Sequence, residues 1–171
     1  MILENPLKGA RAKRPVIIFL HGFGRKRTGE LEAFQKAFEN DYDILMPELF
    51  DPEDPKDSNG ILWANRALHV VEKELLKQRK VILGGFSMGG VIASWIATLL
   101  PVKKLILTAP AFDLINLKNT GNILASLITH FTHLESPQEI ANFNGLPANF
   151  FQTLIDVVVQ FRPYASRISC P

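Results

Sequence analysis

Four short apolar runs alternate with helical patterns over the first two thirds of the chain. The runs lie at residues 16–20, 44–46, 81–83 and 105–107, and no polar residue interrupts them. A strand that is covered on both faces has this character, because helices pack on both sides of a parallel sheet. The runs therefore predict the strands of a parallel sheet.

Amphipathic patterns between these runs predict the helices that connect the strands. Apolar residues recur at helical spacing in residues 28–40 and 59–78, and residues 87–100 form a third such stretch that Pro101 ends. Strand and helix thus alternate through four strands, which is the order of an α/β fold. The acidic stretch 51–59 contains two prolines and is expected to be an exposed loop.

The alternation stops after Pro110, where a longer helical stretch begins. Helices are predicted near residues 120–131, 136–141 and 147–161, and no convincing strand interrupts them. This stretch is therefore expected to be an insertion over the sheet. The last residues, 168–171, have the character of the approach to another strand.

The composition excludes several classes of protein. Hydrophobic residues make up 47% of the chain and charged residues 21%, which is an ordinary balance for a globular domain. The net charge of +2 comes from scattered basic residues, so no nucleic-acid partner is expected. The N-terminus has no signal-peptide pattern, and the apolar runs are too short for stable membrane insertion. With one cysteine and no internal disulfide, a cytoplasmic protein is expected.

A G-x-S-x-G motif stands between the third apolar run and the third predicted helix. Its residues are Gly85-Phe86-Ser87-Met88-Gly89. A serine on such a strand-to-helix turn is lifted above the carboxyl edge of the sheet, and the glycines remove side chains that would collide with neighbouring backbone. The helix N-terminus beside Ser87 also favours negative charge. This context indicates a nucleophilic serine rather than a glycine turn that happens to contain one.

A second glycine motif, His21-Gly22-Phe23-Gly24, follows the first apolar run. Acyl transfer builds negative charge on a carbonyl oxygen. Two backbone N–H groups stabilise that oxygen, and losing one of them typically costs about 3 kcal/mol. We expect the amide of Met88 to be one donor and the amide of Phe23 to be the other. The motif is weak by itself, because a glycine turn after a strand looks the same.

Together the two motifs resemble those of the α/β-hydrolase superfamily, in particular its small esterase, lipase and serine-aminopeptidase-like branch. The resemblance runs from His21 to the strand that ends near Pro110. It implies a mostly parallel α/β-hydrolase sheet with helices on both faces and a helical cap insertion. It also implies that Ser87 is the nucleophile and that the amides of Phe23 and Met88 form the oxyanion hole.

The resemblance divides the chain into three parts. Residues 1–113 are expected to be the N-terminal part of the hydrolase core, residues 114–163 the cap, and residues 164–171 the start of the next core strand. In the family, the acid and the histidine of the catalytic triad follow later strands. We therefore expect this chain to lack its C-terminal strands, acid and base, to leave the last strand uncovered, and to hydrolyse poorly.

Asp113, His130 and His133 offer an acid and a base within the chain. Asp113 follows the fourth strand, a position that some lipases use for the acid, and the two histidines come later, in the order of the family. The alternative is that Asp113 solvates or caps a loop and that both histidines lie on polar faces of cap helices. We favour this alternative, because a catalytic base needs a well-defined loop rather than a mobile cap.

His21, His69 and Cys170 are expected to have structural roles. His21 would close the end of the first strand, His69 would lie at the surface or an interface of its helix, and Cys170 would fill the core as a small apolar side chain. No His, Asp or Glu cluster has the spacing of metal ligands, so neither a metal nor a cofactor is expected.

These features predict a serine hydrolase that cleaves a carboxylic ester or a related acyl compound through an acyl-enzyme on Ser87. Apolar stripes in the predicted cap helices, among them Phe131, Phe150 and Phe161, point to a small-molecule substrate with a hydrophobic acyl group. The alternative is a non-catalytic hydrolase-fold protein that binds a ligand or a partner. Neither the substrate nor an oligomeric state follows from the sequence.

Overall fold

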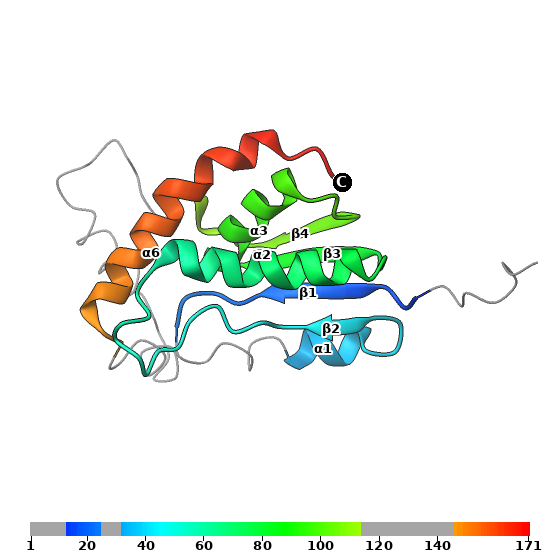
Figure 1. Ribbon diagram of the computed structural model, residues 1–171, viewed down its shortest axis with the longest axis horizontal. Coiled ribbons are helices and arrows are strands. Elements are labelled where there is room, and N and C mark those ends of the chain that lie inside the picture. Colours follow the sequence, from blue (N-terminus) through cyan, green and yellow to red (C-terminus); the bar gives the residue numbers. More distant parts are fainter. Residues whose placement is uncertain (1–12, 25–31, 114–145) are drawn as a thin grey trace, which may run out of the picture.

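Each of the four apolar runs forms a β-strand in the computed structural model, which describes residues 13–24, 32–113 and 146–171. The strands are β1 (Val16–Leu20), β2 (Asp43–Leu45), β3 (Val81–Phe86) and β4 (Lys104–Thr108). They pair in parallel in the order β2-β1-β3-β4 (Figure 1). The predicted parallel α/β sheet is confirmed. β3 is longer than predicted, because Gly84 and Gly85 continue its pairing with β1.

The helices predicted within the described ranges are present. They are α1 (Glu32–Phe38), α2 (Gly60–Leu76), α3 (Met88–Leu99) and α6 (Ala148–Phe161). Two short 3-10 segments, η2 (Ala111–Asp113) and η4 (Arg162–Arg167), were not predicted. α2 begins where the Asn59 side chain accepts hydrogen bonds from the N–H groups of Ile61 and Leu62. None of the helices that the structure describes is long and apolar enough to cross a bilayer. The helices predicted at residues 120–131 and 136–141 lie outside the described residues.

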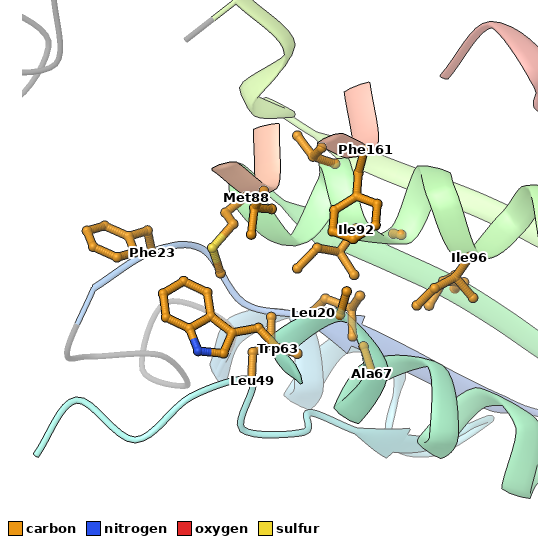
Figure 2. Packing of buried hydrophobic residues seen from close by; sticks show 14 of the residues in the cluster. Leu20, Phe23, Leu49, Trp63, Ala67, Met88, Ile92, Ile96 and Phe161 are labelled. Atoms are coloured by element: carbon orange, nitrogen blue, oxygen red, sulfur yellow. The ribbon is translucent and has the colours of Figure 1, made fainter. Parts of the chain in front are cut away.

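β1 is buried on both faces, as its sequence predicts. Ile18 and Leu20 belong to the main core cluster, which includes side chains of α2, α3 and α6, whereas Phe19 points to the opposite face. There the Phe19 ring centroid lies 5.0 Å from that of Phe34 in α1. Figure 2 shows Leu20 among side chains of α2, α3 and α6. Helices therefore pack on both faces of the sheet.

α6 packs with α2 and α3 and shares their core. Four of its side chains are at most 2% exposed: Phe150, Leu154, Val157 and Val158. A Cβ at Gly60, the first residue of α2, would lie 2.6 Å from Cγ2 of Val157, so α6 meets α2 closely. In Figure 1, α6 runs obliquely past α2 and α3. Residues 148–161, which the sequence assigned to a cap, are therefore part of the core layer in this structure, whereas residues 114–145 lie outside the described residues.

β4 forms an edge of the described sheet. Its side chains alternate between exposed and half-buried, and Ile106 is 37% exposed. The backbone N–H of Leu105 donates a hydrogen bond of 2.9 Å to the carbonyl oxygen of Pro171. The end of the segment 168–171 thus meets β4, where the sequence predicts the approach to another strand.

An ion network ties the amino ends of the strands to the last turn of α2. The guanidinium of Arg79 donates to Oε2 of Glu74 at 2.9 Å, to the carboxylate of Asp43 and to the carbonyl oxygen of Arg14. Lys77 donates to the other Glu74 oxygen at 2.6 Å. Burial raises the pKa of the Glu74 carboxyl, but the hydrogen bonds from Lys77 and Arg79 outweigh burial and hold that pKa below its ordinary value.

Replacing Glu74 by Gln is expected to lower the free energy of unfolding by about 1–3 kcal/mol at neutral pH, because hydrogen bonds to a charged carboxylate are lost. The folded-state pKa of Glu74 lies below its unfolded value. The advantage of the wild type is therefore complete above about pH 4.5 and disappears as the pH falls through the folded-state pKa. Urea unfolding between pH 7 and about pH 3 measures this difference.

Glu72→Gln is the matched control for Glu74→Gln. Glu72 lies on the same helix and pairs with His69, whose side chain is 75% exposed. This control is expected to change the stability by less than about 1 kcal/mol. A stability loss in Glu74→Gln that stays constant across the pH range would contradict the assigned charge of Glu74.

Candidate functional site

The strand order reverses direction between β1 and β3. From β1 the chain runs to β2 on one side of the sheet and then returns to β3 on the other. In open parallel sheets, ligands bind at the carboxyl ends of the strands where such a reversal occurs. Residues 21–24 follow β1 and Ser87 follows β3, so the reversal lies between the two glycine motifs.

Ser87 lies between the end of β3 and the start of α3, as the G-x-S-x-G motif predicts. Its backbone has φ 50° and ψ −116°, a conformation that residues with a side chain rarely adopt and that is found mainly at functional sites. The Ser87 N–H donates to the carbonyl oxygen of Thr108, and the Ser87 carbonyl accepts from the N–H of Ala111, both at 3.1 Å. The chain around β4 therefore holds this turn from both sides. The Ser87 side chain is half-buried, and its hydroxyl makes no hydrogen bond within the described ranges.

Two glycines of the motif allow the turn to pack directly on the neighbouring backbone. A Cβ at Gly85 would lie 2.3 Å from the carbonyl oxygen of Gly89, and a Cβ at Gly89 would lie 2.3 Å from the carbonyl oxygen of Leu20. The second contact presses the first turn of α3 against the end of β1. As a result, a Cβ at Gly22 would lie 3.4 Å from Cβ of Ser87, so the loop after β1 borders the serine.

Gly89→Ala is expected to lower the free energy of unfolding by about 1–3 kcal/mol, because the new methyl group would overlap two backbone carbonyl groups. These belong to Leu20 and His21, at 2.3 and 2.6 Å, and neither can turn aside as a flexible side chain can. Urea unfolding measures the loss. Leu99→Ala, at the half-exposed end of the same helix, is the control and should cost less than about 1 kcal/mol. Wild-type stability in Gly89→Ala would show that the loop and the helix can separate without cost.

Phe23 and Met88 lie on the two elements that border Ser87. Met88 is the first residue of α3, so its N–H has no acceptor within the helix, and no backbone acceptor for it lies among the described residues. The side chains of both residues are buried in the main core cluster. Figure 2 shows both side chains near the chain that follows β1. An oxyanion hole formed by the Phe23 and Met88 amides stays a prediction.

His21 has the structural position expected for it. It is 2% exposed, and its Nε2 accepts a hydrogen bond of 3.0 Å from the N–H of Leu49. An imidazole that accepts at Nε2 carries its proton at Nδ1, which therefore donates to the carbonyl oxygen of Gly22 at 2.6 Å. Both ring nitrogens are thus bound to backbone groups, and the ring connects the loop after β1 to the loop after β2.

The structure describes some of the other residues singled out from the sequence and leaves others outside its described ranges. Asp113 ends η2, whose first residue donates its N–H to the Ser87 carbonyl, but the Asp113 side chain lies outside the described structure. His130 and His133 lie outside the described residues, so an acid–base pair within the chain stays a prediction. His69 is exposed and pairs with Glu72, as expected for a surface position. Cys170 is half-buried and packs against the core cluster.

Asp57 and Arg66 were not singled out from the sequence, and the expectation of an exposed loop at residues 51–59 is wrong for Asp57. Asp57 is 8% exposed, and its Oδ2 accepts from Nη1 of Arg66 at 2.6 Å. Their separation matches neither helical nor strand periodicity, which is why pattern analysis missed the pair. In the part of the chain that the structure describes, no three His, Cys, Asp or Glu residues are grouped so that they could hold a metal ion.

An open hollow of about 390 Å³ lies between η2, α6 and η4. Phe112 and Val158 are among its apolar lining residues, and Arg162 is its charged lining residue. Phe112 follows Ala111, which is hydrogen-bonded to the Ser87 backbone. The hollow thus begins next to the segment that supports the serine.

A family model described as the alpha/beta hydrolase fold matches residues 15–153. This match covers most of the chain, including both glycine motifs and all four strands. The chain therefore belongs to the α/β-hydrolase family, which the motifs and the parallel sheet had indicated.

Solved structures of lipases and a thioesterase are similar to this chain at low sequence identity. A structure from work on two metagenome-derived lipolytic enzymes, LipS and LipT, has a TM-score of 0.66 and 18% identity and covers 92% of this chain and 69% of that chain. The RedJ thioesterase of prodiginine biosynthesis in Streptomyces coelicolor has a TM-score of 0.49 and 16% identity, over 98% and 72%. The mature lipase BlEst2 of Bacillus licheniformis has a TM-score of 0.47 and 21% identity, over 97% and 67%. The first of these matches shows that the fold is shared.

Proposed function

We propose that this protein is a serine hydrolase that cleaves a carboxylic ester or a related acyl compound through an acyl-enzyme on Ser87. The observation that carries the proposal is the backbone of Ser87, at φ 50°, on the turn between β3 and α3. Such a conformation costs about 1–3 kcal/mol, and proteins keep that strain mainly where function needs it. It holds the serine hydroxyl at the carboxyl edge of the sheet, beside the reversal of the strand order.

The proposed reaction begins with attack of Ser87 Oγ on the acyl carbonyl carbon, while a base takes the hydroxyl proton. The carbonyl electron pair moves onto oxygen, and the amides of Phe23 and Met88, together with the N-terminus of α3, would stabilise that negative charge. Collapse of this intermediate releases the alcohol, which receives the proton, and leaves the acyl group on Ser87. Water then attacks the acyl-enzyme and releases the carboxylic acid.

A base is needed because a serine hydroxyl is a poor nucleophile at neutral pH. His21 does not suit this role, because both of its ring nitrogens are hydrogen-bonded to the backbone. Asp113, with His130 or His133, is the acid–base pair to test within this chain. This order of serine, acid and histidine is the order of the family.

A hydrophobic acyl group is the substrate feature that we propose. The hollow between η2, α6 and η4 has a mainly apolar lining and begins at Phe112, next to the segment that supports Ser87. The similarity in fold to a lipolytic enzyme agrees with this substrate class. Ligands that fill such a hollow are small molecules.

The test is covalent labelling of Ser87 by a fluorophosphonate, together with turnover of a short-chain aryl ester. The wild-type chain should be labelled at Ser87, as read by mass spectrometry of its peptides. Ser87→Ala should lose the label, and any turnover should fall by at least about a thousandfold. Ser169→Ala, which removes an exposed serine hydroxyl away from the lining of the hollow, is the control and should behave as the wild type does.

The outcome also decides between the proposed enzyme and a non-catalytic binding protein. No labelling of Ser87 and equal turnover by the wild type and Ser87→Ala would overturn the proposal and favour the binding protein. Where turnover depends on Ser87, His130→Asn and His133→Asn identify the base. Loss of turnover in one of them would place the base within the chain.

A further inference from the structure

Asp57 is a buried acid in a loop that was expected to be exposed. Its side chain is 7% exposed, and its Oδ2 accepts hydrogen bonds from the N–H of Asp51 at 2.8 Å and from Nη1 of Arg66 at 2.6 Å. Its Oδ1 is buried and has no hydrogen-bond partner among the described residues. A buried oxygen without a partner costs about 1–3 kcal/mol, so this carboxylate is kept at a cost to stability.

Arg66 carries the interaction from Asp57 to the loop after β2. The same Nη1 that binds Asp57 also donates to the carbonyl oxygen of Leu49 at 2.8 Å. The N–H of Leu49 in turn donates to Nε2 of His21 at 3.0 Å. Three hydrogen bonds, connected through the side chain of Arg66 and the backbone of Leu49, therefore join Asp57 to His21, the first residue of the loop after β1.

Aromatic contacts form a second path between the same two places. The Phe50 ring lies 5.4 Å from the His21 ring, 5.8 Å from the Phe23 ring and 4.5 Å from the Trp63 ring, measured between centroids. The indole N–H of Trp63 donates to the carbonyl oxygen of Asp57 at 2.8 Å. Asp57 thus reaches Leu49 through its carboxylate and Arg66, and its backbone carbonyl supports Trp63, whose ring packs against Phe50.

We infer that Asp57 and Arg66 are positioning residues for the oxyanion hole. They hold residues 49–50 in place, and through Leu49 and Phe50 they hold His21 and the loop that carries the Phe23 amide. This inference rests on the proposed function. Backbone donors stabilise an oxyanion only when they are already placed for it, and a displacement of about 1 Å can cost about a hundredfold in rate.

The competing explanation is that the pair only stabilises the fold. Arg66 is 42% exposed in its side chain, and an ion pair that is open to water on one side adds little stability by itself. A purely stabilising pair would lower the melting temperature when it is lost and would leave the chemistry of Ser87 unchanged well below that temperature. A positioning pair would slow the chemistry in protein that is still folded.

The test compares Arg66→Met, Arg66→Lys and the control Lys73→Met, which removes an exposed cation from the same helix. The readouts are the rate of Ser87 labelling by a fluorophosphonate and, where turnover is measurable, kcat and KM for an aryl ester. Arg66→Met is expected to lower the labelling rate and kcat by about 10- to 100-fold with KM nearly unchanged. Because both hydrogen bonds come from one nitrogen, Arg66→Lys should stay within about threefold of the wild type. Lys73→Met should match the wild type.

A second readout follows His21 directly and needs no activity. In the wild type, the ring nitrogens of His21 should show, by nitrogen-15 NMR, a proton on Nδ1 and an accepting Nε2. Arg66→Met should shift the Nε2 signal, because Leu49 is no longer held, whereas Arg66→Lys should restore it. If Arg66→Met does not fold, Asp57→Asn takes its place, since it keeps the size of the side chain.

The outcomes separate this inference from the proposed function. An unlabelled wild-type Ser87 would overturn the proposed function, and the positioning role with it. A labelled wild type with an equal labelling rate in folded Arg66→Met would overturn the positioning role alone. Unchanged His21 signals in folded Arg66→Met would also overturn it, whatever the activity.

Discussion

The contact between Gly89 and the end of β1 is the constraint on which the site depends. A Cβ at Gly89 would lie 2.3 Å from the Leu20 carbonyl oxygen, so only a glycine lets the first turn of α3 rest on that backbone. This close approach places Ser87 beside Gly22 and leaves the first N–H groups of α3 at the same edge of the sheet. Without this contact, Ser87 at the end of β3 and the loop after β1 would not lie side by side.

The two ends of the sheet differ in how well their polar groups are hydrogen-bonded. At the amino ends of the strands, Arg79 binds Glu74, Asp43 and a backbone carbonyl, and these groups satisfy one another. At the carboxyl ends, Ser87 has an unfavourable backbone conformation, and Asp57 has a buried oxygen that no group in the described ranges binds. Gln78, before the amino end of β3, also has positive φ, but Ser87 and the Asp57 oxygen both lie at the end where the proposed chemistry takes place, as expected when function and stability make opposing demands.

α6 shows what an apolar stripe leaves open. The sequence predicted the helix but placed it in a cap, because the helical stretch interrupts the alternation of strands and helices. A stripe shows that one face of a helix must be covered, but not by what. In the structure, α2 and α3 cover it, and Val157 meets Gly60 directly. α2 ends at Leu76 and α3 at Leu99, whereas α6 begins at Ala148, so the covering helices lie beyond the reach of local periodicity.

The sequence by itself determined the four strands, the helices between them and the place of Ser87. Each of these follows from local rules, since a short apolar run, an amphipathic period and a glycine-flanked turn act within a few residues. Tertiary structure alone decided that Gly89 meets Leu20, that α6 joins the core, and that Asp57 reaches Arg66 and, through Leu49, His21. Those contacts join residues that sequence spacing cannot relate, because the parallel sheet brings the carboxyl ends of distant strands to one edge.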